Sequence, residues 1–403
     1  MTRKCNEGFI QSYLIYTSKQ GSPPVFKIWS ALGAISAVLK RNVWMESSGA
    51  IEQTGYYRLH PNIYMVLVSP AGVGYKSTSI QLALELIEKA EIDINVLQGA
   101  ITLPRLFSRL AVASGKSPVN VGDLYIHITE FKVLVKGIIR DSALIENLTN
   151  MYDGRRCQYE TQNMGQYDIK NPCVAIAGAS TPEWLSLGSV DVMTGGLGAR
   201  IIPIAVPDWE QEEFWPTKIQ LVLEEEEKLL RDLQSIASLN GSYFVSQETK
   251  ALFTTWGKTI RKTRNEDRRL DPYYSKKHDL VRKVAMLLAA SESDDMAVNT
   301  DHIEQSIELF DELEKTMLFA HQGTVASPRL TYLDTVLEDI KNEGELSRRT
   351  LLKRFKHCLI GEDFEGIIKQ LKEMGEIKEH CTSEGGVGDV VYKYLDSKIE
   401  EGD

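Results

Sequence analysis

The feature that most constrains the fold of this chain is an apolar run that leads directly into a glycine-containing loop and then into a helix. Residues 63–68 read Ile-Tyr-Met-Val-Leu-Val, which is the length and composition of a strand buried on both faces. The loop 69–78, Ser-Pro-Ala-Gly-Val-Gly-Tyr-Lys-Ser-Thr, follows it. Apolar residues then recur near helical spacing from Ile80 to Ile87. This order predicts an α/β core with a phosphate-binding loop at the end of a strand.

The residues of this loop are of the types that bind nucleotide phosphates. Gly72 and Gly74 allow backbone N–H groups to curl around phosphate oxygens, and the helix N-terminus adds its dipole. We expect Lys76 to reach the β- and γ-phosphates of ATP, and the Ser77 hydroxyl to ligate Mg²⁺. Tyr75 stands where the usual pattern has glycine, so an ordinary strand-to-helix turn is the alternative. The expected ATP contacts are Gly72, Val73, Gly74, Tyr75, Lys76, Ser77 and Thr78.

An ATPase of this kind also needs an acid at the end of a neighbouring strand, to hold Mg²⁺ or to polarise water. The apolar run 124–128 ends in Thr129-Glu130 and provides one. Thr129 occupies the place where the usual site has aspartate, so Glu130 is the predicted catalytic acid and second Mg²⁺ ligand. A strand-end carboxylate that faces solvent is the alternative. His127, in the middle of this strand, is predicted to be a packed core histidine.

A third apolar run, 173–177, ends in Gly178-Ala179-Ser180. A small hydroxyl residue at the end of a strand beside the phosphate loop can sense the γ-phosphate, which makes Ser180 a candidate contact to ATP. The alternative, which the sequence leaves open, is that the following Thr181-Pro182 simply begins a helix.

Arg200 follows a glycine-rich segment, 195–198, and precedes another apolar run. An arginine held on such a loop is a candidate arginine finger, which stabilises the charge that develops on a transferred phosphoryl group. We expect it to act across a subunit interface. A surface ion pair explains the same residue equally well.

The order of elements along the chain predicts four parts. Residues 1–60 read as a helical and hairpin segment that packs on the core, and 61–216 alternate strand and helix as in a parallel sheet. Residues 217–322 read almost entirely as helix and form a predicted lid. After the linker 323–328, residues 329–403 show three helices and a hairpin, which is the winged-helix order. The predicted fold class is therefore an α/β P-loop NTPase of AAA+ or RecA type, with a helical lid and a C-terminal winged helix.

Composition limits the choice of partners. The chain carries 46 basic and 56 acidic residues, a net charge of −10, so nucleic acid must be bound by local basic patches. Three segments are candidates: the turn 153–156 (Asp-Gly-Arg-Arg), 258–283, where Tyr273 and Tyr274 lie among cations as suits single-stranded DNA, and 348–356. Simple solvation of the turn and protein binding by the winged helix are the alternatives. The 403 residues hold five scattered cysteines and no apolar stretch of membrane-spanning length, so we expect a cytoplasmic protein without membrane contact.

Several blocks of the sequence resemble an uncharacterised family of P-loop ATPases encoded by phages, plasmids and mobile elements, often beside or fused to primases. The blocks are 29–36, 61–78, 151–154, 171–172, 180–183 and 195–200. That family has the same extra residue before the P-loop lysine. The resemblance runs from about Phe26 to Leu313 and implies a replicative helicase-like ATPase that forms a ring.

The order of core, helical lid and winged helix also looks like that of AAA+ replication proteins, including the minichromosome maintenance helicases. This likeness implies that Arg282, on the lid helix 280–290, is a second phosphate sensor. The function expected from the whole sequence is an Mg²⁺-dependent ATPase that acts on DNA in mobile-element replication, most concretely a hexameric helicase with a possible primase partner. A helicase loader, or another assembly factor switched by ATP, is the alternative. A nucleotide-binding regulator whose winged helix binds a protein is the third.

Overall fold

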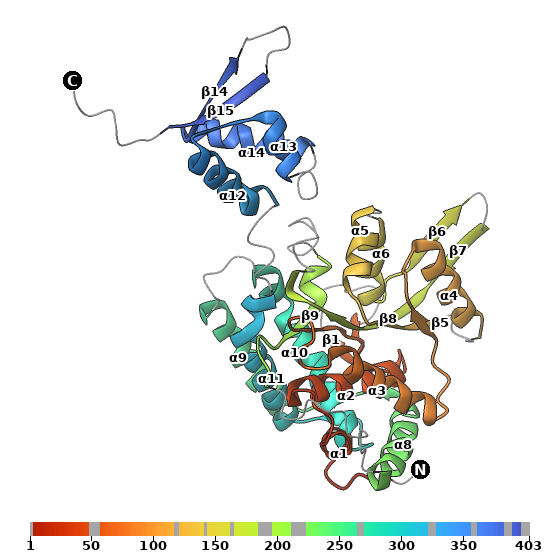
Figure 1. Cartoon of the computed structure of the whole chain (residues 1–403). Coiled ribbons are helices and arrows are strands. Elements are labelled where there is room, and N and C mark those ends of the chain that lie inside the picture. The colour runs from red at the N-terminus through yellow and green to blue at the C-terminus, as the bar shows by residue number, and fades with distance from the viewer. Residues whose placement is uncertain are drawn as a thin grey trace. The chain divides into compact units, whose positions relative to one another are not determined.

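The computed structural model describes residues 3–47, 57–116, 121–140, 143–161, 165–183, 196–210, 223–263, 270–320, 328–355, 361–382 and 389–395. The chain divides into two compact units, Met1–Gln322 and Gly323–Asp403 (Figure 1). The expected linker 323–328 lies outside the described residues except for Pro328, which begins a helix.

The centre of the first unit is a parallel five-stranded sheet with strand order β4-β5-β8-β3-β9. Every residue of β3 is buried, because this strand is covered on both faces. The three later apolar runs of the sequence became β5, β8 and β9, and the short β4 was not expected. The strands are β3 (Tyr64–Val68), β4 (Val96–Gln98), β5 (Val121–Ile128), β8 (Asn171–Ser180) and β9 (Ile201–Ala205).

Helices cover both faces of this sheet, with α1, α2, α3 and α8 on one side and α5 and α6 on the other (Figure 1). Helix α2 is almost wholly buried, since apart from Lys27 and two serines its buried positions hold apolar residues and glycine. The helices up to β9 are α1 (Phe9–Tyr16), α2 (Pro24–Leu39), α3 (Lys76–Lys89), α4 (Leu103–Lys116), α5 (Lys132–Arg140) and α6 (Ala143–Tyr152), and the 3-10 turn η2 (Gly198–Arg200) precedes β9.

The helices expected to form a lid share the core of this unit. Helix α8 (Leu223–Ala237) packs on α1, α2 and α3, while α10 (Asp271–Glu292) and α11 (Thr300–Ala320) pack on α2 and β9 respectively. The Asn299 side chain accepts a hydrogen bond of 3.0 Å from the His302 N–H and so caps α11. The parts expected N-terminal to residue 322 therefore lie in one compact unit with one continuous hydrophobic core.

Short strands complete the unit. The expected hairpin is β1 (Val43–Ser47) with β2 (Tyr57–Leu59), and β10 (Gly241–Ser242) joins β1. A second hairpin, β6 (Cys157–Thr161) with β7 (Gly165–Ile169), was not expected, and neither was the pair β11 (Phe244–Val245) and β12 (Ala297–Val298). Helix α9 (Gln247–Thr263) packs on α11.

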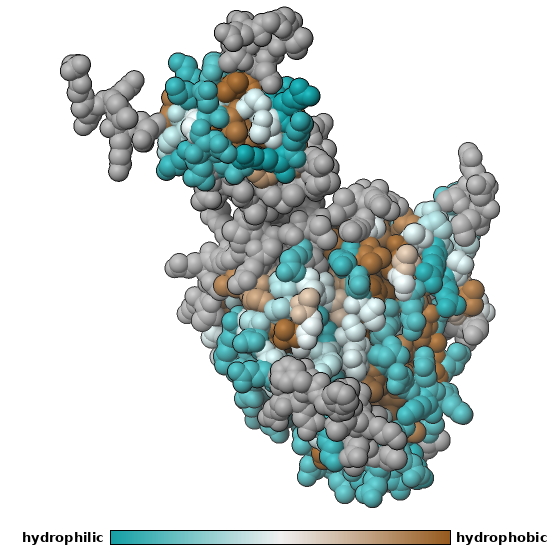
Figure 2. Space-filling model, in the orientation of Figure 1, coloured by the Kyte–Doolittle hydropathy of each residue, from teal (hydrophilic) through white to brown (hydrophobic). Residues whose placement is uncertain are grey.

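The second unit has the three expected helices and the expected hairpin, with one additional strand. Its order is α12 (Pro328–Glu343), β13 (Glu345–Ser347), α13 (Arg348–Phe355), α14 (Gly361–Glu373), β14 (Ile377–Thr382) and β15 (Asp389–Tyr394). The antiparallel sheet has the order β13-β15-β14 and covers a separate small core. On the face shown in Figure 2, mostly hydrophilic residues surround a small apolar area of this unit.

Candidate nucleotide site

The predicted phosphate loop connects the end of β3 to the start of α3. Gly72 and Gly74 have φ angles of +78° and +73°, the left-handed region that glycine adopts without steric cost. A methyl group placed on Gly72 would meet no atom within 4 Å, so the loop backbone is open at this point. Tyr75, at φ +48°, is a non-glycine residue in the same region and is the last residue before α3. The loop therefore has the backbone curvature of an anion-binding turn at a helix N-terminus.

The Lys76 side chain folds back over this loop. Its ammonium group donates to the Ser69 carbonyl at 3.0 Å, to the Ser69 hydroxyl at 2.8 Å and to the Pro70 carbonyl at 2.9 Å. Half-burial lowers the pKa of Lys76, and the Glu183 carboxylate opposes that shift by its charge. The loop thus holds one cation at its centre, surrounded by neutral oxygens.

Ser77, the predicted Mg²⁺ ligand, points toward the end of β5. Its hydroxyl lies 3.5 Å from the Thr129 carbonyl oxygen, so the start of α3 and the end of β5 meet here. Glu130 follows Thr129, and its carboxylate is 62% exposed and 3.2 Å from the Lys132 ammonium. The two predicted metal-binding residues thus belong to segments in direct contact.

Strand β5 is not the immediate neighbour of β3, which differs from the expectation for Glu130. Strand β8 lies between them, and it pairs Val68 of β3 with Ser180. The Ser180 carbonyl accepts a long hydrogen bond of 3.4 Å from the Ser69 N–H, which places Ser180 directly beside the phosphate loop. His127 is buried, as predicted for a core histidine.

Sequence reasoning missed two groups that lie near the loop. Glu183 follows β8, and its charge reaches Lys76; the segment 181–183 had been interpreted only as a helix start. The connection between α1 and α2 also contacts the loop: the Ser22 hydroxyl donates to the Tyr75 carbonyl at 3.4 Å, and a Cβ on Gly74 would lie 3.4 Å from the Pro23 ring. No local pattern in the sequence signals these contacts, because the segments are distant along the chain.

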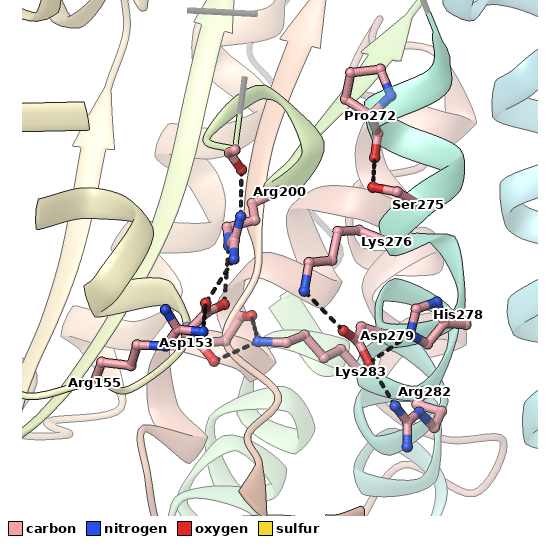
Figure 3. Close-up of polar contacts among 12 residues, drawn as sticks. Asp153, Arg155, Arg200, Pro272, Ser275, Lys276, His278, Asp279, Arg282 and Lys283 are labelled. Carbon is pink, nitrogen blue, oxygen red and sulfur yellow. Dashed lines mark hydrogen bonds and ion pairs between the residues drawn. The ribbon is translucent and has the colours of Figure 1, made fainter. Parts of the chain in front are cut away.

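Arg200 lies near the N-terminal ends of the parallel strands, whereas the phosphate loop follows the C-terminal end of β3. Ile201 pairs with Tyr64 at the start of β3, so Arg200 stands about 20 Å along the strand direction from Ser69. Its guanidinium makes two hydrogen bonds to Asp153, at 3.0 and 2.7 Å, and contacts the Gly196 carbonyl at 2.5 Å (Figure 3). The pair is buried, with side-chain exposures of 8% and 4%. Arg200 therefore does not reach the phosphate loop of its own chain.

Arg282 also lies away from the loop of its own chain. The next residue, Lys283, donates to the carbonyl and side-chain oxygens of Asn62, which precedes β3. Arg282 itself donates to Asp279 at 2.6 Å on the same helix (Figure 3). Arg200 and Lys283 thus lie near the N-terminal ends of the parallel strands, whereas the phosphate loop follows the C-terminal end of β3.

The predicted nucleic-acid segments are described only in part. Residues 264–269 of the basic region lie outside the described residues, as does 356 of the C-terminal one. Within that segment Arg348 pairs with Glu365, and Arg354 pairs with Asp339 and Glu343. In the turn 153–156, Asp153 holds Arg200 and Arg156 pairs with Asp168, so acidic partners offset part of each patch.

The described ranges contain no helix long and apolar enough to cross a bilayer. They also contain no group of three or more histidine, cysteine, aspartate or glutamate side chains placed to hold a metal ion.

The sequence matches no protein-family model and no curated protein. Solved structures are similar at a low level, and two of them are described here. One is a full-length MCM homolog from Methanopyrus kandleri, with a TM-score of 0.39 and 11% identity over 76% of this chain, which spans 61% of that protein. The other is the apo C-terminal region of NrS-1, with a TM-score of 0.28 and 10% identity over 98% of this chain and 76% of that one. These scores are too low to support a functional assignment, which rests on the residues described above.

Proposed function

We propose that this protein is an Mg²⁺-dependent ATPase that acts on DNA, most concretely a hexameric replicative helicase of a phage or other mobile element. The observation that carries the proposal is the phosphate loop, in which Lys76 is held among loop oxygens while Ser77 touches the end of β5. The open backbone at Gly72 and the helix N-terminus behind it suit a phosphate group. The Ser77 hydroxyl and the Glu130 carboxylate are the oxygen ligands that Mg²⁺ prefers.

In this proposal Glu130 has two tasks and each of the other residues of the site has one. The loop N–H groups and Lys76 bind the phosphates, and Ser77 with Glu130 holds Mg²⁺, which neutralises charge on the phosphates when bound. Glu130 accepts a proton from the attacking water, since its carboxylate is exposed at the end of β5. Ser180, at the end of the neighbouring strand β8, senses the γ-phosphate. Tyr75 ends the loop, and Thr78 in the first turn of α3 completes the proposed contacts to ATP.

The oligomer follows from the position of the two arginines. Arg200 lies at the end of the sheet opposite the loop, so it can serve a nucleotide only when another copy presents its loop to that end. Lys283, the residue after Arg282, contacts Asn62 at the same end. We propose a homo-oligomeric ring, most concretely a hexamer. In this ring Arg200 is the arginine finger and Arg282 is a second phosphate sensor. Because Arg200 is bound to Asp153 within the chain, the finger has to exchange partners when it acts.

We assign residues 61–216 to the ATPase core, 217–322 to a helical lid, and 329–403 to a winged helix. Single-stranded DNA is the proposed substrate of the ring, with a primase as a possible partner. The second unit supports the winged-helix assignment by its element order and its β13-β15-β14 sheet.

The test is ATP hydrolysis by the full chain with and without single-stranded DNA. Lys76→Ala should lower turnover by roughly 100-fold or more, because the charge on the transferred phosphoryl group loses its fixed cation. Lys89→Ala is the matched control, since Lys89 is an exposed lysine in the last turn of the same helix. Near-wild-type turnover by a folded Lys76→Ala chain refutes the site.

The alternative is a helicase loader that uses ATP as a switch. Strand separation on a forked DNA substrate selects the helicase. DNA-stimulated turnover without strand separation, together with tight binding to a separate helicase, selects the loader.

A further inference from the structure

Two exposed aromatic side chains lie beside the phosphate loop, and both contact the same glycine. Tyr75, the last residue before α3, is 40% exposed, and a Cβ on Gly21 would lie 3.0 Å from its ring. Trp209, which follows β9, is 37% exposed, and its indole N–H donates to the Gly21 carbonyl oxygen at 2.8 Å. A single exposed aromatic needs no explanation, but two that meet at one residue beside a ligand site form a surface for a flat apolar group.

The backbone holds Tyr75 in a conformation that favours glycine. Its φ and ψ angles are +48° and +41°, in the left-handed region that non-glycine residues seldom adopt. The Ser22 hydroxyl donates to the Tyr75 carbonyl, and the missing side chain at Gly21 leaves room for the ring. A strained residue that the surrounding structure holds in place beside a loop of this kind points to a function for its side chain.

The strand order places this aromatic surface at one end of the proposed nucleotide site. Strand β8, which ends at Ser180, lies on one side of β3, and β9 lies on the other. The Val206 N–H donates to the Val68 carbonyl at 2.8 Å, so the segment that leads to Trp209 starts beside the end of β3. The proposed contacts to the γ-phosphate and Mg²⁺, Ser180 and Glu130, are on the β8 side. The nucleoside end of a bound nucleotide therefore points toward β9 and Trp209.

We propose that the ring faces of Tyr75 and Trp209 bind the base of the nucleotide, an inference that rests on the proposed nucleotide site. Stacking on an aromatic side chain contributes substantially to the binding of a base, and every base has a face that can stack. The tyrosine that replaces the usual glycine of the loop thereby supplies a contact to the base from within the phosphate loop itself. The surface favours a nucleotide over a polyphosphate without a base.

Isothermal titration calorimetry of the full chain with Mg²⁺ tests the proposal, with ADP and inorganic pyrophosphate as the two probes. Both probes carry a diphosphate, and only ADP carries a nucleoside. Tyr75→Gly removes the ring and introduces the residue that adopts a φ of +48° without steric cost, so the loop keeps its form. This variant should weaken ADP binding roughly fivefold or more and change pyrophosphate binding by less than about twofold. Trp209→Leu should give the same pattern.

Two further variants separate the base contact from the phosphate site. Lys76→Ala should weaken the binding of both probes, because it removes a contact to phosphate. Phe244→Leu is the matched control and should change neither, since Phe244 is an exposed aromatic residue of β11. Circular dichroism confirms that each variant is folded.

The outcomes distinguish the two proposals. If Lys76→Ala weakens both probes while Tyr75→Gly and Trp209→Leu leave ADP binding unchanged, the phosphate site stands and the base contact is wrong. Equal losses for ADP and pyrophosphate in Tyr75→Gly also overturn it, because Tyr75 then acts only through the form of the loop. A wild-type chain that binds neither probe refutes the nucleotide site and the base contact together.

Discussion

The buried Asp153–Arg200 pair gives the sharpest quantitative prediction. Asp153→Ala leaves the Arg200 guanidinium at 8% exposure with both of its hydrogen bonds to Asp153 removed. Removal of one partner from a buried pair costs about 3–5 kcal/mol, because the remaining charge is neither hydrated nor neutralised. Arg200→Ala should destabilise by less, because Arg155 still lies 3.5 Å from Asp153. The double variant should destabilise by clearly less than the sum, since the uncompensated charge is then absent.

The Arg156–Asp168 pair is a matched control. It has the same fork geometry, with hydrogen bonds of 2.7 and 2.6 Å, but its side chains are 57% and 32% exposed. A surface pair contributes about 0–1 kcal/mol, so Arg156→Ala should be nearly neutral. Urea unfolding followed by tryptophan fluorescence measures both pairs, because all six tryptophans precede residue 323 and report on the first unit. A loss below about 1 kcal/mol in Asp153→Ala, equal to that in Arg156→Ala, would falsify the buried-pair argument.

Three further predictions concern the site and its surroundings. Glu130→Gln should bind ATP and hydrolyse little of it, since the amide keeps the shape of the carboxylate and loses the base; nucleotide retained after gel filtration measures this. A mixture of Lys76→Ala and Arg200→Ala chains should recover some ATPase activity, because one type of mixed interface has an intact loop and an intact arginine. Burial lowers the pKa of Lys283 to about 7, so between pH 7 and 9 the unfolded chain holds a proton that the folded chain has lost. Stability should therefore rise with pH in this range, by at most about 1.4 kcal/mol per pH unit, and the rise should be absent in Lys283→Met.

Each of these has a result that contradicts it. Normal turnover by Glu130→Gln, together with loss of turnover in Glu183→Gln, would show that the catalytic acid follows β8 and is not Glu130. Mixed rings shown by crosslinking that stay inactive at every ratio remove Arg200 as the finger, and a chain that stays monomeric with ATP and DNA removes the ring. An identical dependence of stability on pH in the wild-type and Lys283→Met chains shows that Lys283 keeps its ordinary pKa.

Much of the local structure was predictable because its causes are local. The apolar runs before the phosphate loop and before Glu130 became strands of the sheet, and Phe26–Leu39 lies in α2. The longest apolar runs predicted strands most clearly, since a strand buried on both faces is apolar at every position and shows no alternation of polar and apolar residues. The hairpin β6–β7 was not predicted from the sequence. Its Tyr159 and Tyr167 pack against Phe107, which is distant along the chain, so no local pattern indicates the contact.

The amino-acid sequence by itself determined the local form of the predicted phosphate loop, because the positions of its glycines and the Lys76-Ser77 order are properties of consecutive residues. The tertiary structure decided which strand lies beside it, placing β8 and Ser180 between β3 and Glu130. It also decided that Arg200 and Lys283 lie near the N-terminal ends of the strands, away from the loop. Their position depends on strand register and on the packing of α10 near the start of β3. Strand order and the pairing of distant charges depend on which surfaces bury one another, and the free energy of that burial belongs to the whole unit rather than to any one segment.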